Sequence, residues 1–557
     1  MTTTKSDQHK LRIAVMLDSL VVPKWVRKIL SDIEASKFAR LTATLLMGKD
    51  KRKGRRLAGV ARVFRSLLFH VYERLDRVLF RAENDAFQPV DASDVLDQTE
   101  TIRLTPTRDA TGRALGDDDV ALVRSKRLDV ILAFGSADLT GRILGAARCG
   151  VWSFHHGDPC EYRGSPPLFW EIYDQNPVTV TALVLLTEGP CGKVIYRSYA
   201  ATDCSTLYRS RNATYWKTSE FMLRRLRDLW KRGWDHIASL ETYQEEPTYD
   251  RALRSSPGNW TMIRFLARLA YRYLHNRYIT LLLNIKWFLA IRPRRQPTAH
   301  RFDPTGFEVI EPPKGRFWAD PFLLKVGPET HVFFEDVAYA KRRGVISHFK
   351  IAPDGSRTEP NVVLERNYHL SYPFVFEWND QIYMIPETGQ NRTVELYKAT
   401  DFPLRWELVK VLFNDVYAVD ATLLEQDGRF WLFVNMSPSG GASDDELFLF
   451  YADSPLGRWT PHAMNPIVSD VRRARPAGRP FRQGPDLIRP SQDCSTRYGH
   501  AIVLNKIETL SEGEYRETIV GRVESHWHPG CIGTHTLNRG EDYEIVDGYV
   551  LRWRWQG

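Results

Sequence analysis

The chain has 557 residues, of which 43% are hydrophobic and 26% charged, and it carries a formal net charge of +9. These values describe a soluble globular protein of two or three domains and exclude a disordered chain. The sequence has no uncharged apolar run of 18 residues and no CxxC pair among its six cysteines, which argues against a membrane-spanning helix, a structural zinc site and a disulfide scaffold.

The polar N-terminus, MTTTKSDQHK, leads directly into a predicted strand and shows no secretory signal. Cysteines without a regular framework suit a reducing compartment. We therefore expect a cytoplasmic protein, and we predict no metal site.

Residues 11–215 alternate strand and helix patterns. We predict strands at 11–17, 128–134, 151–154 and 178–186. We also predict one helix that begins with residues 25–33 and a second helix over residues 139–149. Strands separated by helices imply parallel pairing and a doubly wound α/β domain. Because ligands bind such domains at the carboxyl ends of the strands, the loop after residue 154 is a candidate site.

The segment 216–300 is predicted to be a basic helical connector. Residues 251–295 contain ten Lys or Arg and no Asp or Glu, and the run 279–291 is apolar apart from Lys286. Three arginines recur every four residues on one helical face: Arg264, Arg268 and Arg272. This pattern is typical of contact with an anionic membrane surface, which would hold the protein at the inner face of the membrane.

Two alternatives for this segment remain open: a helix docked between domains, or a dimer interface. No nucleic-acid-reading module appears, and the apolar face is too continuous for one, so we expect no nucleic-acid partner. The sequence leaves the oligomeric state undecided.

Residues 301–557 are all-β and contain an internal repeat. Five blocks begin alike, with anchors spaced by 52, 48, 59 and 56 residues: Asp320, Tyr372, Asp420, Arg479 and His535. Periods near 50 residues with short strands predict a five-bladed β-propeller. The first strand of each blade lines the central channel, so we expect the five anchors to converge there.

The loop Ser153–Trp170, SFHHGDPCEYRGSPPLFW, resembles the active-site loop of formyltransferases that use 10-formyltetrahydrofolate, the family of the methionyl-tRNA and sugar N-formyltransferases. The closing Arg163-Gly164-Ser165-Pro166 matches that family, which places His155 on its catalytic His and Ser153 on its Asn. The following strand and Gly192 also match, whereas Pro190 stands at the position of the catalytic Asp.

Formyl transfer needs an oxyanion donor and a base that takes a proton from the attacking amine. The resemblance implies His155 as the central catalytic group and the Ser153 hydroxyl as the donor. Asp158 or Glu188 could replace the missing Asp, and His156 could replace His155. We also expect substrate contacts from the loop residues His156, Arg163 and Gly164. The alternative is a retained fold with lost or altered chemistry.

The propeller sequence resembles the N-terminal domain of plant glucosamine inositolphosphorylceramide transferases and, more distantly, five-bladed arabinanases and xylosidases. The likeness includes Ala319–Phe322, His369–Val375 and Gly478–Phe481. The glycosidase likeness implies Asp320 as a base, Asp420 as a second channel carboxylate, and Glu387 or Glu335 as the acid.

We expect a polar sugar to be bound by channel residues: Asp320, Tyr372, Glu387, Asp420, Arg479 and His535. The alternative is that Asp320 and Asp420 only begin strands and cap blade turns.

The sequence therefore predicts a carbohydrate-active transferase. Formyl transfer from 10-formyltetrahydrofolate to an amino sugar on a nucleotide- or lipid-linked glycan is the leading hypothesis, with the propeller binding the sugar. Glycosyl transfer or hydrolysis by the propeller is the second. A non-catalytic scaffold or glycan-binding protein with a degenerate formyltransferase fold is the third.

Overall fold

The computed structural model describes residues 10–48, 64–108, 112–135, 139–158, 161–162, 164–188, 192–240, 254–295, 302–437 and 444–554. The chain divides into two compact units. The first holds most residues up to Tyr271, and the second holds most residues from Arg272 onward.

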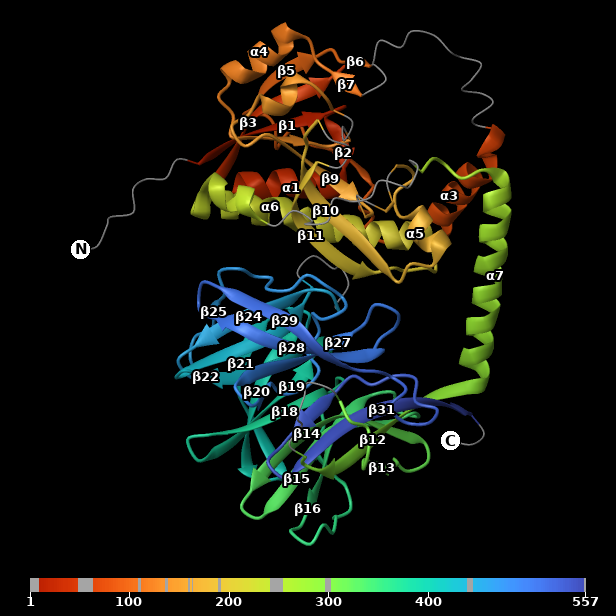
Figure 1. Ribbon diagram of the computed structural model, residues 1–557, viewed down its shortest axis with the longest axis vertical. Helices are drawn as coiled ribbons and strands as arrows, with labels where there is room; N and C mark the ends of the chain where they lie inside the picture. Colours follow the sequence, from red (N-terminus) through yellow and green to blue (C-terminus); the bar gives the residue numbers. More distant parts are fainter. Residues whose placement is uncertain are drawn as a thin grey trace, which may run out of the picture. The chain divides into compact units, whose positions relative to one another are not determined.

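A seven-stranded sheet forms the centre of the first unit (Figure 1). Its strands, in spatial order, are β11 (Lys193–Ala201), β10 (Val178–Leu185), β9 (Val151–His156), β8 (Val130–Ala133), β1 (Leu11–Leu17), β3 (Ala39–Met47) and β5 (Glu100–Leu104). The pairs from β9 through β8, β1 and β3 to β5 are parallel. The predicted parallel sheet is confirmed.

Helices cover both faces of this sheet, because alternate residues of its strands point to opposite sides. From β1, Ile13 and Val15 pack into the core with α1 (Lys24–Ala35) and α6 (Leu207–Ser239). Ala14 and Met16 pack on the other side with α4 (Asp117–Ser125). The remaining elements of this unit are β2 (Val21–Pro23), α3 (Leu67–Phe80), β4 (Pro89–Asp91), β6 (Thr107–Arg108), β7 (Arg113–Ala114), η1 (Arg142–Gly145), α5 (Phe169–Asp174) and most of α7 (Asn259–Leu282).

Two details of the first unit differ from the sequence prediction. Strand β10 runs antiparallel to β9. The six-residue α5 between them spans only about 9 Å, too short to carry the chain back along β9 for a parallel crossover. The helix predicted over 139–149 was wrong: only the 3₁₀ turn η1 forms there, since Gly145 weakens a helix interior and Gly141 has φ of 80°.

The second unit is built from five four-stranded sheets. Four of them run in chain order: β14 (Arg316–Val326), β15 (Glu329–Ala338), β16 (Gly344–Ile351) and β17 (Asn361–Leu364); β18 (Ser371–Trp378), β19 (Gln381–Thr388), β20 (Thr393–Asp401) and β21 (Arg405–Asn414); β22 (Ala418–Gln426), β23 (Arg429–Met436), β24 (Leu447–Ala452) and β25 (Thr460–Pro461); β26 (Phe481–Gln483), β27 (Asp486–Asp493), β28 (Ala501–Leu510) and β29 (Tyr515–Val523). A short 3₁₀ turn, η2 (Gly389–Asn391), lies in the second of these sheets. The predicted five-bladed β-propeller is confirmed.

The fifth blade joins the two ends of the unit. It consists of β13 (Glu308–Ile310), β12 (Leu283–Pro293), β31 (Tyr543–Trp553) and β30 (Leu537–Arg539). Strand β12 pairs antiparallel with β31 along its whole length, from Leu283 opposite Trp553 to Pro293 opposite Tyr543. This pairing closes the propeller between strands that are far apart in the sequence.

The closure corrects the interpretation of the apolar run 279–291. Most of this run is strand β12, and Trp287 through Ile291 are buried in the propeller. Short apolar runs do not distinguish a buried strand from a helix, which is why the sequence pattern misled. The segment 216–300, predicted as one connector, thus contains the larger part of α6, helix α7 and a propeller strand.

Candidate functional site

The candidate site of the first unit lies at the end of β9. Ser153 is buried there, and its hydroxyl donates a hydrogen bond to the backbone carbonyl of Ala133 at 3.0 Å. The proton of this hydroxyl is thus donated to the neighbouring strand β8 and not toward the loop. This geometry does not support the predicted role of Ser153 as the oxyanion donor.

The two histidines of the loop have different surroundings. His155 is half-buried, and its Nδ1 lies 3.1 Å from the carbonyl oxygen of Gly157. His156 stacks on Tyr215 with ring centroids 3.7 Å apart, and its Nε2 lies 3.3 Å from the Thr218 hydroxyl. Burial, with a smaller contribution from His155, lowers the pKa of His156 to about 3. His156 is therefore a neutral packing residue, and it does not fit the predicted role in catalysis or substrate binding.

The remaining predicted loop residues are spread along the chain. Asp158 accepts a hydrogen bond from the backbone nitrogen of Glu161, and exposed Glu188 accepts one from that of Gly141. Gly164 has φ of 110°, and a Cβ there would collide with the carbonyl of Arg254, so this glycine permits a close backbone approach. Arg163 and Pro190 lie outside the described residues.

Sequence reasoning missed Glu171, a carboxyl group beside the loop. It lies on α5 and is only 1% exposed, and its Oε1 has no hydrogen-bond partner. A Cβ added to Gly157 would lie 2.8 Å from this oxygen. Burial and, to a smaller degree, the charge of Asp158 raise the pKa of Glu171 to about 7. Within the sequence, Glu171 is an ordinary helix residue, so no pattern pointed to it.

In the propeller, the first strands of three blades share a bulge. The pairing register shifts at Asp320 in β14, at Tyr372 in β18 and at Asp420 in β22. These residues have φ of 50°, 44° and 52°, a left-handed conformation that is uncommon outside glycine. Such bulges re-aim side chains, and the repetition explains why these anchors recur in the sequence.

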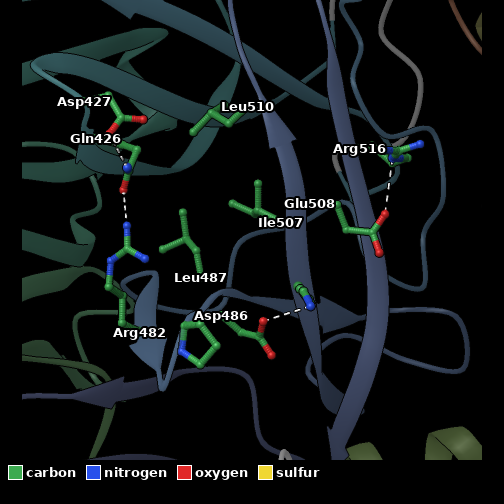
Figure 2. A pocket seen from close by; sticks show the side chains of 11 residues that line it. Gln426, Asp427, Arg482, Asp486, Leu487, Ile507, Glu508, Leu510 and Arg516 are labelled. Carbon is green, nitrogen blue, oxygen red and sulfur yellow. Dashed lines mark hydrogen bonds and ion pairs between the residues drawn. The ribbon is translucent and has the colours of Figure 1, made fainter.

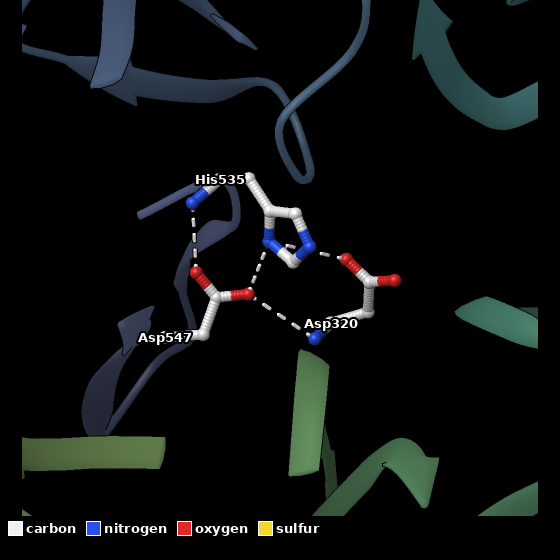
Figure 3. Close-up of side chains that lie close together, drawn as sticks. All are labelled: Asp320, His535 and Asp547. Atoms are coloured by element: carbon white, nitrogen blue, oxygen red, sulfur yellow. Dashed lines mark hydrogen bonds and ion pairs between the residues drawn. The ribbon is translucent and has the colours of Figure 1, made fainter. Parts of the chain in front are cut away.

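One cluster joins the first and last blades (Figure 3). Nδ1 of His535 lies 2.5 Å from Oδ2 of Asp547 and 3.6 Å from Oδ1 of Asp320. Thr536 donates its hydroxyl to Asp320 at 2.6 Å. Burial by itself lowers the pKa of His535, but the carboxylates of Asp547 and Asp320 outweigh this effect and raise it to about 9. Burial raises the pKa of Asp320, although His535 opposes the shift.

The same cluster offers three possible metal-ligand atoms within 4.8 Å of one another, on Asp320, His535 and Asp547. With its raised pKa, His535 is an imidazolium at neutral pH. The cluster therefore fits a buried ion pair, because a cation would first have to displace the proton of His535.

A second cluster surrounds Arg475. Its Nε lies 2.5 Å from Oδ2 of Asp420, its Nη1 lies 2.8 Å from Oδ1 of Asp444, and its Nη2 lies 3.6 Å from Oε2 of Glu387. Gln492 also donates to Oδ2 of Asp420, at 3.1 Å. Burial raises the pKa of Glu387 well above its usual range, and the charge of Asp420 adds to the shift.

Tyr372 lies between these clusters. Its backbone nitrogen donates to Asp320 at 3.3 Å, while its hydroxyl lies 2.8 Å from the Thr422 hydroxyl and accepts from the Gly478 nitrogen at 2.8 Å. The structure thus brings Asp320, Tyr372 and His535 together.

Arg479 differs from the other anchors. Its guanidinium donates to the carbonyl of Val375 and lies 4.5 Å from the ring centroid of Phe374. It fastens two blades to each other, and these contacts do not fit the predicted role in sugar binding. Glu335 is held by His369, whose Nε2 lies 2.9 Å from Oε1 of the carboxyl group.

Two half-exposed tyrosines lie beside the Arg475 cluster. The Arg475 guanidinium lies 4.8 Å from the ring centroid of Tyr498, which is 43% exposed. Tyr417 is 40% exposed, and burial together with the charge of Glu387 raises its pKa. Flat aromatic faces next to charged hydrogen-bonding groups suit a sugar. The sequence analysis missed Arg475, Tyr417 and Tyr498 because they lie outside the repeated blade openings.

A pocket of about 500 Å³ lies elsewhere on the propeller (Figure 2). Its polar side chains bind one another within the pocket: Arg482 donates to the amide oxygen of Gln426 at 2.7 Å, Lys506 lies 2.8 Å from Asp486, and Arg516 lies 3.2 Å from Glu508. Since these groups satisfy one another, the channel clusters are the stronger candidate site.

Residues 311–529, within the propeller, match the family described as glucosamine inositolphosphorylceramide transferase 1, N-terminal. The protein of that name from Arabidopsis thaliana is 40% identical over 247 residues, which cover 42% of this chain and 32% of the relative. The relative from Oryza sativa subsp. japonica is 40% identical over 208 residues, which cover 37% and 28%. This chain therefore spans about a third of the length of the curated relatives it matches.

Among solved structures, Zg3597, a family 117 glycoside hydrolase from Zobellia galactanivorans, is 13% identical with a TM-score of 0.31. The alignment covers 47% of this chain and 90% of that chain. A score this low supports no argument about activity.

Proposed function

We propose that the protein is a carbohydrate-active transferase whose propeller binds the sugar part of a glycolipid. The observation that carries this proposal is the Arg475 cluster, with its buried charges next to the half-exposed rings of Tyr498 and Tyr417. The names of the matched relatives contain an amino sugar and a phosphorylated lipid, which supports a glycolipid as the ligand.

The geometry favours binding over hydrolysis. An inverting glycosidase needs two carboxyl groups that flank the sugar with room for a water molecule. Asp420 is instead held by Arg475 and Gln492, and buried Asp320 accepts hydrogen bonds from Thr536 and Tyr372. Neither carboxyl group is open to a substrate, so glycosyl transfer or sugar recognition is the better assignment for this unit.

Sugar binding is tested with the full chain on an array of soluble glycans that includes amino sugars and inositol phosphates. We expect the substitution Tyr498→Ala to weaken binding at least tenfold, because it removes an aromatic face, while Tyr498→Phe retains most of it. Ile519→Ala changes an exposed residue of strand β29, whereas Tyr498 lies in a turn, and it is the control. Unchanged binding by Tyr498→Ala, or no bound glycan, would contradict the proposal.

Formyl transfer by the first unit is a second candidate, and one observation favours it. Glu171 lies next to Gly157, whose carbonyl oxygen is 3.1 Å from Nδ1 of the half-buried His155, and its pKa of about 7 suits proton exchange at neutral pH. The donor would be 10-formyltetrahydrofolate, as the resemblance of the loop implies. The buried Ser153 leaves the oxyanion donor without an assigned residue.

Calorimetric titration with a reduced folate tests this candidate. The parent chain should bind the folate, and in the presence of an amino-sugar acceptor His155→Ala should abolish transfer of the formyl group. The absence of folate binding at millimolar ligand would rule out formyl transfer and leave sugar binding by the propeller untouched.

We further propose that the protein works at the inner face of the membrane, with α7 in contact with anionic lipid. No helix within the described ranges is long and apolar enough to cross a membrane. Helix α7 nevertheless exposes large apolar side chains, including Trp260 at 77%, and its charged residues are all arginines. An apolar surface with basic neighbours is typical of helices that lie on an anionic bilayer.

A further inference from the structure

The second strands of three blades carry a polar residue at one repeated position. Each pairs with the residue directly before a bulged anchor: Glu335 opposite Ala319, Glu387 opposite Ser371, and Asn435 opposite Val419. His369 lies 2.9 Å from the carboxyl group of Glu335, and Arg475 lies 3.6 Å from that of Glu387. The repeat thus gives the first two blades a carboxyl group at the channel and the third blade an amide.

The amide of Asn435 has no hydrogen-bond partner within the described part of the chain. Its oxygen and its nitrogen are both unpartnered, although the residue is 0% exposed. Phe433 lies two residues earlier, on the same face of β23, and belongs to the same core cluster as Ala474, the residue before Arg475. A buried amide with both groups unmet is costly, and beside the Arg475 cluster it is typical of a site whose ligand supplies the partners.

Carboxyl groups outnumber cations in the channel clusters. Arg475 faces three of them and His535 faces two (Figure 3): Asp420, Asp444 and Glu387 in the first cluster, and Asp320 and Asp547 in the second. Two positive charges neutralise only two of these five carboxylates. The clusters therefore attract a cation and repel an anionic group such as a phosphate.

One of these carboxyl groups, Glu387, holds a proton. It is hydrogen-bonded to the carboxyl group of Asp420, and two carboxyl groups share a hydrogen bond only when one of them is protonated. Burial and, to a smaller degree, the charge of Asp420 raise the pKa of Glu387 well above its usual range, although Arg475 opposes the shift. A ligand cation beside Glu387 would take the place of this proton. The charged and titratable groups around Glu387 are Asp420, Arg475, Asp320, Tyr417 and Tyr498.

The Arg475 cluster is accessible through two carboxyl groups and two aromatic rings. The side chains of Glu387 and Asp444 are 15% and 30% exposed. Tyr417 and Tyr498 are 40% and 43% exposed. The face of an aromatic ring attracts a cation, and proteins hold ammonium ligands against such faces. Carboxyl groups beside tyrosine rings therefore favour a ligand with an ammonium group.

We infer that the Arg475 cluster selects a sugar that carries a free amino group, and that its ammonium pairs with the carboxylate of Glu387 beside the rings of Tyr417 and Tyr498. The inference rests on the proposed function, because it assumes that the propeller binds a sugar, and it adds the charge of that sugar. On binding, the carboxyl proton of Glu387 passes to solvent, and the N–H groups of the ammonium replace it as donors. The sugar hydroxyls supply the partners that the Asn435 amide lacks.

Two other kinds of sugar fit these features less well. An N-acetylated amino sugar is neutral, so it forms no ion pair with Glu387 and leaves the surplus of carboxylates uncompensated. A phosphorylated sugar adds negative charge to a cluster that already has too much of it.

The test is isothermal titration of the full chain with the methyl glycosides of glucosamine, N-acetylglucosamine and glucose. At about pH 6.5, where an amine is protonated, glucosamine should bind at least about tenfold more tightly than the other two. Titration in two buffers of different ionisation enthalpy should show release of about one proton with glucosamine and none with glucose, because Glu387 must ionise to form the ion pair. The same linkage should weaken glucosamine binding as the pH falls to about 5.

A matched pair of substitutions assigns the effect to one residue. Glu387→Gln should lower glucosamine binding to the level of glucose and abolish the proton release. Glu377→Gln removes an exposed carboxyl group from the strand paired with that of Glu387, and it should behave like the parent.

The outcomes separate the inference from the proposed function. Equal affinities of the parent chain for the three sugars, or glucosamine binding without proton release, would overturn the inference and leave sugar recognition standing. A Glu387→Gln variant that keeps the preference for glucosamine would overturn it too. If neither these sugars nor any glycan of the array binds, the proposed function fails together with the inference.

Discussion

At the scale of single residues, the ionisable groups of this protein are buried in two ways. His535, Asp547 and Asp320 satisfy one another, so their charges contribute to the joining of the first and last blades. Glu171 is buried with an oxygen that has no hydrogen-bond partner, which is costly for an ionised carboxylate. Paired buried charges fix geometry, whereas an unsatisfied carboxyl group near a loop is typical of a site whose ligand supplies the partner.

We predict that Glu171→Gln stabilises the first unit above neutral pH. The folded pKa of about 7 lies above the usual value of 4.5, so ionisation of Glu171 as the pH rises from 4.5 through 7 destabilises the folded state. Replacing it with a neutral amide should add about 3 kcal/mol at pH 8, because a shift of about 2.5 pKa units corresponds to that free energy, and the gain should vanish near pH 4. Thermal unfolding of parent and variant across this range measures the difference. A constant difference at all pH values would show that Glu171 is not the titrating group.

At the scale of elements, the strand β12 shows how context changes the meaning of a pattern. Its apolar residues looked like a continuation of the helix before it, and only the partner strand β31 identifies them as part of a blade. Helix α3 shows a related limit, because Val71, Leu75 and Val78 recur at helical spacing and are nevertheless exposed. Hydrophobic periodicity predicts that an apolar face exists, while its partner depends on tertiary contacts.

The role of β12 can be measured with one matched pair of substitutions. Phe288 is 1% exposed on this strand, so Phe288→Ala should destabilise the propeller by about 3–5 kcal/mol through lost burial and a residual cavity. Ile285→Ala, on the same strand but half-exposed, should have a small effect. Urea unfolding followed by tryptophan fluorescence reports both values. Equal effects of the two substitutions would contradict burial of β12 in the fifth blade.

At the scale of the whole molecule, the chain consists of two units with separate cores. Each unit brings a candidate site of its own, the β9 loop in the first and the channel clusters in the second. Helix α3 and the first half of α7 belong to the first unit, and Tyr417 and Tyr498 belong to the second. The proposed membrane contact and the proposed sugar binding would thus involve different parts of one chain.

Separate cores predict unfolding in two steps. Ile29 is fully buried between α1 and the sheet, so Ile29→Ala should shift only the transition of the first unit. Phe288→Ala should shift only that of the second. Calorimetric scans of the two variants and the parent distinguish the steps. If both substitutions lower a single shared transition, the two units are thermodynamically one.

The sequence by itself determined the parallel α/β sheet and the five blades, because strand-helix alternation and a period near 50 residues are local patterns that survive without knowledge of contacts. It also located the anchors Asp320, Tyr372, Asp420 and His535, since each occupies the same position in its repeat. Only the tertiary structure decided which groups meet. Arg475, Tyr498 and Asp547 join the channel clusters from positions outside the repeated openings, Ser153 is turned into the sheet, and β12 closes the propeller with the far end of the chain. These outcomes depend on pairing between distant segments and on burial, and neither is encoded in a local pattern.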